Sequence, residues 1–370
     1  MSRITVFIPS FGHGGVEKMM VTLAGGFAQA GVATDLVTRP GQLAYLEGLD
    51  AAVRLVRVEN PRTDVLPYLL SARPAVVLSA KEDDDRVALD ARDAAGIGTR
   101  VFLRCGTHLS SRPKLATANP LRRWWHRRRL RRQFARADGI VCISGGVADD
   151  VAGVTGLPRD RLHVVHNPVL TPSVLAQLEE PCPHPWLAPG QRPVVLAAGR
   201  LAPVKRFDDL LSAVAPLLVE RQLRLVILGE GKKREPLLRL AERLGVRALV
   251  DLPGFVDNVL PYMRRAAAFV HPSEREGYGN VLAEALLCGT PVVATDCPTG
   301  PREILAGGRY GPLVPVGDVR ALREALASVL DDPLPADTLR SAVAGRTLEQ
   351  ACRGYLAAFG LAVPGAPPPE

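Results

Sequence analysis

The chain of 370 residues is poor in aromatic side chains, which make up 5% of it. This scarcity disfavours the stacking platforms with which proteins bind single-stranded nucleic acid. No apolar run reaches the roughly 18 residues of a membrane span, so we expect no transmembrane helix. The apolar stretch Ile4–Pro9 is also too short for the core of a signal peptide, and we expect the protein to remain in the cytoplasm.

Cysteine pairs and metal-binding patterns are missing as well. Six cysteines are present, but none are spaced as CxxC, and no cysteine and histidine cluster has zinc-site spacing. We therefore expect reduced thiols. Hydrophobic residues make up 47% and charged residues 23%, which excludes extensive disorder. The formal net charge of +8 favours an anionic partner: a phosphate group, nucleic acid or a membrane surface.

The first part of the chain alternates short apolar runs with helical patterns. Ile4–Ile8 is a continuous apolar run typical of a strand buried on both faces, and a glycine turn and a helix ending near Gly31 follow it. Five more strands are expected, at Val32–Thr38, Ala75–Ser79, Arg100–Leu103, Gly139–Ile143 and Leu162–Val165. This alternation predicts an α/β fold with a parallel sheet.

A proline-rich stretch separates this series from a second one. Glu179–Pro185 is too rich in proline for a helix or a central strand, and we interpret residues 171–192 as an interdomain linker. Strands are expected next at Val194–Ala198, Arg224–Leu228, Leu249–Leu252, Ala268–His271 and Pro291–Ala294, and helices at 234–244, 319–330 and 347–359. The prediction is two Rossmann-like domains, residues 1–170 and 193–346, followed by a last helix and a frayed tail over 347–370.

Glycines mark one candidate phosphate site. Gly12, Gly14 and Gly15 lie between the first strand and the first helix, where free backbone N–H groups and the helix dipole favour an anion. The pattern is neither GxGxxG nor a P-loop, because Glu17 stands in place of the last glycine. A tight turn without a ligand fits this loop equally well.

Two cations follow the first strand of the second series. Arg200 and Lys205 stand five residues apart, at the strand end where α/β sheets bind ligands. Arginine offers a planar fork for phosphate oxygens and lysine a point charge. The pair therefore predicts a phosphate site, and a solvated loop is the alternative.

The strongest local pattern pairs two carboxylates eight residues apart. Glu276 lies in a loop with Gly277 and Gly279, and Glu284 lies early in a helix that we expect Asn280 to cap and Gly289 to end. Carboxylates accept paired hydrogen bonds from vicinal hydroxyls, so both can hold sugar rings. Complementing the helix N-terminus is the alternative for Glu284, but this does not explain Glu276.

Three further features are weaker. Asp83–Asp85 contains a DxD pattern that can hold a divalent metal, but acidic residues at a helix start are routine, and we expect no metal there. His108 follows a strand end, where a structural and a functional role are equally open. Eight arginines and two tryptophans gather in Arg122–Arg136, which fits a solvated helix or an anionic membrane surface. No nucleic-acid recognition motif accompanies them.

Taken together, these motifs resemble the retaining glycosyltransferases of family 4 (GT4), which have the two-domain GT-B fold. The spacing of Glu276 and Glu284 is that family's E-x7-E motif, and it occurs in order with Arg200 and Lys205. The resemblance spans nearly the whole chain and is carried by Ala198–Lys205, Leu228–Gly231, Pro253–Phe255, His271–Ser273, Gly289–Ala294, Val141–Ser144 and Val165–Val169. The segment Asp296–Leu305 is similar to the bacterial subset that builds cell-surface polysaccharides.

The resemblance implies a role for each site residue. Arg200 and Lys205 would neutralise the donor pyrophosphate, and Glu276 would bind the donor sugar together with amides of Gly277, Tyr278, Gly279, Asn280 and Val281. Glu284 would hold the ribose hydroxyls, and His108 would lie beside the sugar. Gly14 and Gly15 would face the phosphates from the first domain, to which the last helix would return.

The resemblance also implies the reaction. The chain would be a metal-independent hexosyltransferase without a cofactor, moving a sugar from a nucleotide sugar, with UDP expected, to a saccharide or lipid-linked acceptor. The reaction would belong to cell-surface polysaccharide or lipopolysaccharide synthesis, with no nucleic-acid partner. Independently of the resemblance, the arginines and tryptophans of Arg122–Arg136 predict a peripheral contact with the anionic inner membrane, and the acceptor is the alternative partner of this segment. The alternatives are a GT-B nucleotide-sugar epimerase and a non-enzymatic nucleic-acid or membrane adaptor that uses residues 122–136.

Overall fold

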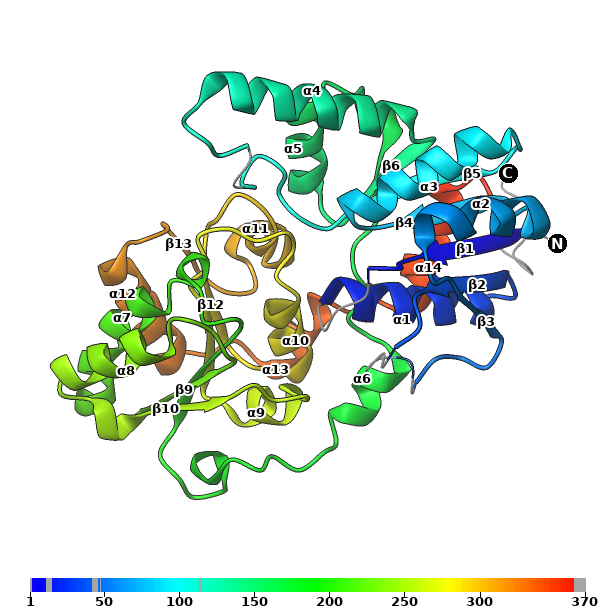
Figure 1. Cartoon of the computed structure of the whole chain (residues 1–370). Coiled ribbons are helices and arrows are strands. Elements are labelled where there is room, and N and C mark those ends of the chain that lie inside the picture. The colour runs from blue at the N-terminus through cyan, green and yellow to red at the C-terminus, as the bar shows by residue number, and fades with distance from the viewer. Residues whose placement is uncertain (1, 11–14, 42–45, 47, 113–114, 363–370) are drawn as a thin grey trace. The chain divides into compact units, whose positions relative to one another are not determined.

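The computed structural model describes residues 2–10, 15–41, 46, 48–112 and 115–362, which divide into two α/β units (Figure 1). Unit 1 consists of residues Met1–Pro168 and Leu348–Glu370, and unit 2 of Val169–Thr347. Each unit has its own parallel sheet and its own buried apolar core.

Unit 1 is built on a seven-stranded parallel sheet in the order β3-β2-β1-β4-β5-β6-β7. Its strands are β1 (Arg3–Phe7), β2 (Ala33–Thr38), β3 (Val53–Arg57), β4 (Val76–Ser79), β5 (Arg100–Cys105), β6 (Gly139–Cys142) and β7 (Leu162–Val164). Its helices are α1 (Gly15–Gln29), α2 (Pro61–Ala72), α3 (Glu82–Ala95), α4 (Pro120–Arg136), α5 (Gly145–Thr155) and α14 (Leu348–Ala358). The central strands are buried on both faces, as continuous apolar runs require.

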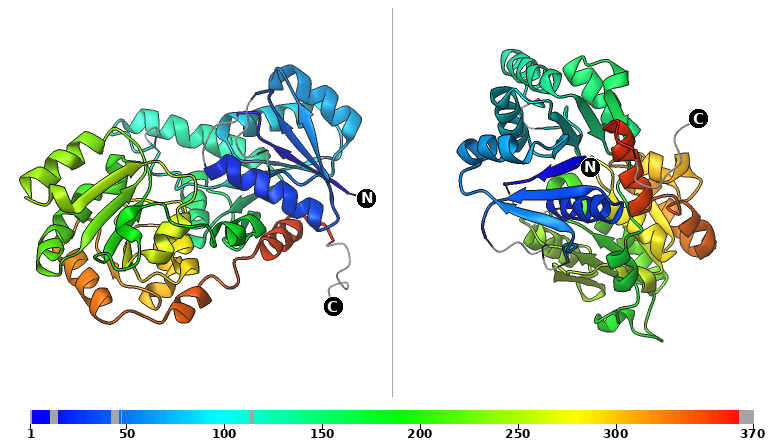
Figure 2. Two further views of the ribbon diagram at one scale, coloured as in Figure 1. Left: turned by 90° about the horizontal axis from the view of Figure 1, so that it is seen from below. Right: turned by 90° about the vertical axis from the view of Figure 1, so that its right-hand side faces the viewer.

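Helix α14 comes from the far end of the chain but belongs to the core of unit 1 (Figure 2). The rings of Phe27 on α1 and Tyr355 on α14 meet edge to face, with their centroids 5.9 Å apart. Arg104 of β5, a buried cation, donates to the Tyr355 hydroxyl oxygen at 3.0 Å and to Oδ1 of Asn167 at 2.6 Å. A Cβ on Gly26 would lie 2.5 Å from Sγ of Cys352, so the close packing of the two helices requires glycine there.

Unit 2 has a six-stranded parallel sheet in the order β10-β9-β8-β11-β12-β13. Its strands are β8 (Val194–Ala198), β9 (Arg224–Leu228), β10 (Val250–Gly254), β11 (Ala268–His271), β12 (Val292–Thr295) and β13 (Leu313–Val314). Its helices are α6 (Pro172–Gln177), α7 (Phe207–Glu220), α8 (Arg234–Arg243), α9 (Leu260–Arg265), α10 (Asn280–Cys288), α11 (Pro301–Ile304), α12 (Val319–Asp331) and α13 (Ala336–Ser341).

Three local predictions need correction. Helix α6 lies inside the segment that we interpreted as a linker, because Thr171 caps it and Pro172 takes the first position, where proline is tolerated. Asn280 does not cap α10 but is its first residue, since Gly279 occupies the cap in a left-handed conformation. Strands β3 and β13 and helix α13 were not predicted. The short strand β13 and the largely exposed face of β3 carry little apolar signal.

Candidate active site

The loops at the carboxyl ends of β8 and β9 interlock through their backbones. Gly229 has φ +127°, and a Cβ on it would lie 2.1 Å from the carbonyl oxygen of Gly199. A Cβ on Gly231 would likewise lie 2.3 Å from the carbonyl oxygen of Leu201. The Leu201 N–H donates to the carbonyl oxygen of Glu230 at 2.8 Å, which ties the loops together. Only glycine fits these positions, so the loop that carries Arg200 has one defined course.

A cavity of about 330 Å³ opens at the carboxyl ends of β8, β9 and β10. Its walls are mostly apolar and include Phe255, which is 70% exposed, and Val281 from the first turn of α10. Arg200 and Glu230 supply the charged groups of the lining. Apolar walls with a few convergent polar groups at this edge of a parallel sheet are typical of a small-molecule site.

A largely buried carboxylate, Glu276, forms the centre of a polar cluster in the same unit. Nζ of Lys205 donates to its Oε1, and the Ser273 hydroxyl donates to the same oxygen at 2.8 Å. Nε2 of His271, at the end of β11, lies 3.1 Å from Oε1. The side chains of Lys205, Glu276 and His271 are 19%, 14% and 2% exposed. The cluster therefore fixes the position of a carboxylate that faces little water.

Opposing effects act on the charge of Glu276. Burial raises the pKa of its carboxyl group, but the hydrogen bond and charge of His271 and the charge of Lys205 lower it by more. The net result is a pKa well below the usual range of a glutamate, so the group stays ionised. A permanently charged carboxylate beside a lysine can accept hydrogen bonds from sugar hydroxyls but is a poor proton donor.

The segment from Glu276 into α10 holds the remaining residues predicted for this part of the site. Gly279 is left-handed with φ +96° and begins the turn into the helix. Tyr278 is buried, which raises the pKa of its hydroxyl to about 12, and the Arg346 guanidinium lies 5.9 Å from its ring centroid. Glu284 lies in the second turn of α10 and is partly buried.

The structure thus brings Glu276 and Lys205 into contact and places Arg200 and Val281 on one cavity. Gly277, Tyr278, Gly279, Asn280 and Glu284 follow Glu276 in the same loop and helix. His271 and Ser273 belong to the Glu276 cluster but were not singled out from the sequence as site residues. A histidine that ends a strand five residues before Glu276 and its glycine-rich loop was the signal that could have indicated them.

His108 lies in unit 1, in the loop that follows β5. Its Nδ1 is 3.0 Å from the Ser110 hydroxyl and 3.5 Å from Oδ1 of Asp150 on α5. Asp150 also accepts from the backbone N–H groups of Leu109 and Ser110. The imidazole is therefore held from its Nδ1 side, and its side chain is 18% exposed.

The glycine loop of unit 1 is only partly described. Gly14 lies outside the described residues, and Gly15 is the first residue of α1. A Cβ on Gly15 would meet nothing within 4 Å. The phosphate-binding role of the two glycines stays a prediction.

The three carboxylates of Asp83–Asp85 lie in the first turn of α3 and have different surroundings. Asp83 is exposed and pairs with Arg86. Asp84 is buried and accepts from the Ser10 hydroxyl and from the Ser10 N–H. Asp85 is also buried. Among the described residues, no three side chains of His, Cys, Asp or Glu are grouped as metal ligands.

Two family models match the chain, which confirms the resemblance seen in its motifs. "Glycosyltransferase Family 4" matches residues 13–171, and "Glycosyl transferases group 1" matches residues 192–332. The chain belongs to this family and is therefore a glycosyltransferase.

Named relatives cover nearly the full chain. The lipopolysaccharide core biosynthesis glycosyltransferase LpsE of Rhizobium meliloti (strain 1021) is 28% identical, with 90% of this chain and 89% of LpsE covered. A Campylobacter jejuni enzyme is 26% identical, with 92% and 93% covered; its name is N-acetylgalactosamine-N,N'-diacetylbacillosaminyl-diphospho-undecaprenol 4-alpha-N-acetylgalactosaminyltransferase.

Solved structures show the same fold. Anabaena HepE in complex with UDP and glucose superposes with a TM-score of 0.75 at 18% identity, covering 97% of this chain and 100% of HepE. The lipopolysaccharide outer core galactosyltransferase WaaB superposes with a TM-score of 0.73 at 20% identity, covering 97% and 99%. The predicted GT-B fold class is confirmed.

Asp85 makes the stability of the protein depend on pH. Burial raises the pKa of its carboxyl group to about 8, against the hydrogen bond with Ser79, which lowers it. The unfolded chain releases this proton near pH 4, so Asp85 lowers the free energy of unfolding progressively from about pH 4 to pH 8. Because asparagine cannot ionise, Asp85→Asn should gain at least ~1 kcal/mol relative to the native chain between pH 5 and pH 8.5.

Denaturant unfolding at both pH values measures this gain. Asp83→Asn is the matched control, since the Asp83 side chain is 85% exposed and its replacement should give a difference that changes little with pH. A gain for Asp85→Asn that is equal at pH 5 and pH 8.5 would contradict the prediction.

Proposed function

We propose that this chain is a retaining glycosyltransferase that moves a sugar from a UDP-sugar to a saccharide or lipid-linked acceptor of a cell-surface glycan. The main observation behind this proposal is the largely buried Glu276–Lys205 pair, which lies in the same unit as an Arg200-lined cavity at the carboxyl edge of the sheet. The complex of HepE with UDP and glucose supports a UDP-linked donor. The names of LpsE and of the Campylobacter relative support a glycan acceptor.

The residues of unit 2 divide the donor between them. Arg200 and Lys205 meet the diphosphate, and the ionised Glu276 accepts hydrogen bonds from the donor sugar. Backbone amides of Gly277, Tyr278, Gly279 and Asn280 assist. The cavity beside Arg200 and Val281 receives the nucleoside, whose ribose hydroxyls hydrogen-bond to Glu284.

The chemistry follows the movement of charge. As the glycosidic bond breaks, negative charge grows on the β-phosphate of the leaving nucleoside diphosphate, and Arg200 and Lys205 stabilise it there. The Glu276 carboxylate holds Lys205 in place, because it already pairs with the ammonium group. The acceptor hydroxyl attacks from the side of the leaving group, which retains the configuration of the sugar. A role for His108 in this step stays a prediction of the family resemblance.

Replacing Glu276 or Lys205 tests this assignment. Glu276→Gln removes the carboxylate charge, and Lys205→Ala removes a cation that acts on the leaving group. Each should cut sugar transfer at least about a hundredfold, as the loss of one such stabilising group does elsewhere. UDP release from a panel of UDP-sugars with candidate acceptors measures transfer.

The controls for these variants are nearby groups of the same type. Glu274→Gln changes a half-exposed carboxylate two residues away, and Lys232→Ala removes an exposed ammonium group. Both should retain transfer, and thermal unfolding of all four proteins should show that each is folded at the assay temperature, with a lower midpoint expected for Lys205→Ala because it leaves Glu276 without its cation. Near-normal turnover by Glu276→Gln and Lys205→Ala would refute the proposed donor site.

The proposed reaction is metal-independent, because side-chain cations meet the diphosphate charge that a divalent ion would otherwise meet. The two carboxylates of the DxD pattern are Asp83, which pairs with Arg86, and Asp85, which is buried. Transfer in the presence of excess EDTA should equal transfer without it, with an Mg²⁺-dependent glycosyltransferase as the positive control for chelation. Loss of activity in EDTA that Mg²⁺ restores would overturn metal independence.

Helix α4 supports a peripheral contact with an anionic membrane. Leu121, Trp124 and Trp125 are 70%, 54% and 64% exposed, an unusual concentration of large apolar side chains on one surface helix. The helix carries eight arginines and no acidic residue. Among the described residues, an acidic partner is present only for Arg129 and Arg136. No helix in the described ranges is long and apolar enough to cross a membrane.

Arginines at the start of α4 strengthen this proposal. Arg122 and Arg123 lie in the first turn, where the helix dipole disfavours cations and no acidic side chain compensates. An anionic surface against this end of the helix would offset that cost. Tryptophan and leucine side chains suit the interface between lipid headgroups and acyl chains.

Vesicle binding tests the contact. Replacing Arg122, Arg123 and Arg127 by serine should lower co-sedimentation with phosphatidylglycerol-containing vesicles at least ~10-fold, since each basic residue near such a surface contributes about 1 kcal/mol. The matched control replaces three exposed arginines of unit 2 by serine, Arg239, Arg243 and Arg320, and should bind as the native chain does. Equal binding by both triple variants would exclude α4 as the docking surface.

A further inference from the structure

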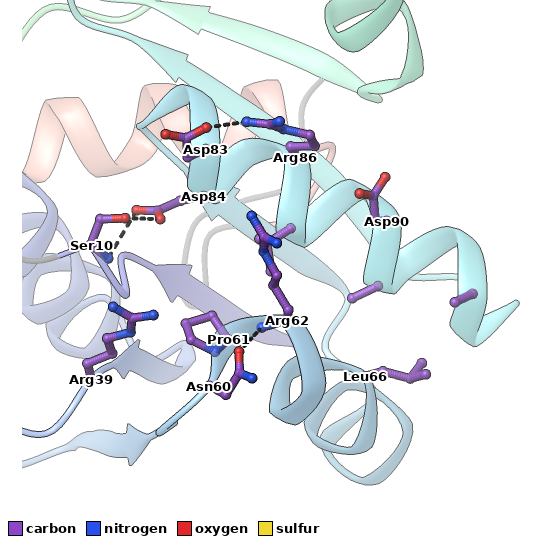
Figure 3. A pocket seen from close by; sticks show the side chains of 13 residues that line it. Ser10, Arg39, Asn60, Pro61, Arg62, Leu66, Asp83, Asp84, Arg86 and Asp90 are labelled. Atoms are coloured by element: carbon purple, nitrogen blue, oxygen red, sulfur yellow. Dashed lines mark hydrogen bonds and ion pairs between the residues drawn. The ribbon is translucent and has the colours of Figure 1, made fainter.

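A second cavity, of about 670 Å³, lies in unit 1 and is not part of the donor site (Figure 3). It opens between α2 and α3 beside the segments that follow β1 and β2, which supply Ser10 and Arg39. Pro61, Leu66 and Val87 form an apolar part of its lining. The volume falls in the range of pockets that bind small molecules.

Each acidic side chain of this cavity is already engaged. Asp83 pairs with Arg86, and Asp84 accepts from the hydroxyl and N–H groups of Ser10. Asp90 pairs with Arg136 of α4, at 2.7 Å. The carboxylates are therefore compensated by partners other than Arg39 and Arg62.

Two arginines of the cavity have no such compensation. Arg39 and Arg62 are exposed, and neither has an acidic partner among the residues that the structure describes. Their side chains come from different elements and extend along the cavity from the end of β2 and the start of α2 (Figure 3). Two guanidinium groups on one concave surface repel each other unless an anion lies between them.

We propose that this cavity binds a saccharide that carries a phosphate or carboxylate group, and that Arg39 and Arg62 hold the anionic group. The inference rests on the proposed function, in which this anionic saccharide is the acceptor. The planar guanidinium fork matches the oxygens of both kinds of anion. A neutral sugar would leave both arginines without an ionic partner.

The rest of the lining suits a sugar ring. The Ser10 hydroxyl and the Asn60 amide lie at the polar side of the cavity, where they can hydrogen-bond to ring hydroxyls. Pro61, Leu66 and Val87 can cover the C–H face of a ring. The acceptor selected by this cavity is thus a charged sugar in preference to a neutral one.

Binding of four small probes to the full chain tests the inference. Glucose is compared with glucose 6-phosphate and with glucuronate, and inorganic phosphate is included to separate recognition of the sugar from recognition of a free anion. Dissociation constants come from ligand-observed NMR titrations at low salt. The native chain should bind at least one of the two charged sugars at least ~10-fold more tightly than glucose, with the tighter of the two identifying the kind of anion.

Variants assign this preference to the two arginines. Arg39→Gln and Arg62→Gln should each abolish most of the preference for the charged sugar while glucose binding changes little. Arg57→Gln is the matched control, because Arg57 is an exposed arginine of unit 1 at the end of β3 that does not line the cavity. Thermal unfolding of each variant reports whether it is folded.

The outcomes separate this inference from the proposed function. Charged sugars that bind no more tightly than glucose, or an Arg57→Gln variant that loses the preference as fully as the other two, would overturn the inference. Phosphate that binds as tightly as glucose 6-phosphate would show an anion site without a saccharide, which also overturns it. Titration of the native chain with UDP tests the donor site independently, so failure of one proposal leaves the other standing.

Discussion

The ion pair between Glu276 and Lys205 is the interaction on which the proposed donor site of unit 2 depends. A carboxylate that is 14% exposed carries a large desolvation cost, and Lys205, Ser273 and His271 all offset it at one oxygen, Oε1. Because these partners come from the loop after β8 and from the end of β11, the pair also joins two neighbouring strand ends. The same contact therefore holds both the carboxylate and the lysine in position.

Backbone packing supports this pair from the other side. The glycines at 229 and 231 let the loops after β8 and β9 approach to distances that any side chain would block. With the loops fixed, Arg200 lines the cavity, and Lys205, five residues further on, reaches Glu276. The excess of positive charge seen in the composition is thus partly localised at a rigid loop.

In unit 1, some arginines are paired with acidic side chains and others have no such partner among the described residues. Its acidic residues on α3 neutralise specific arginines, which leaves Arg39 and Arg62 on one cavity and six arginines of α4 without acidic partners among the described residues. The surroundings of these two sets of arginines differ. The cavity has only a small apolar wall, whereas α4 carries the exposed side chains of Trp124 and Trp125. We therefore propose a charged sugar for the cavity and an anionic surface for the helix.

Strong apolar runs were predicted closely: β8, β9 and β11 have the bounds expected from the sequence. Two weakly apolar strands were not predicted. Strand β3 contains exposed residues and has no continuous apolar run, and β13 is only two residues long. Asn280 was a reasonable helix cap by residue type, but Gly279 took that position because its left-handed backbone turns the loop into α10. Helix α6 formed next to prolines because Pro172 occupies the first turn, where no backbone donor is lost.

By itself, the sequence determined the two α/β series, the family and the candidate carboxylates and cations, because periodicity and motif spacing are local properties of the chain. Tertiary structure decided which of these groups meet. It paired Lys205 with Glu276 across 71 residues of sequence and added His271 to them. It also brought α14 into unit 1 and gathered Arg39 and Arg62 on one cavity. Charged side chains form a binding site only where folding excludes water from them and sets the distances between them. The spacing of residues along the chain determines neither the exclusion of water nor these distances.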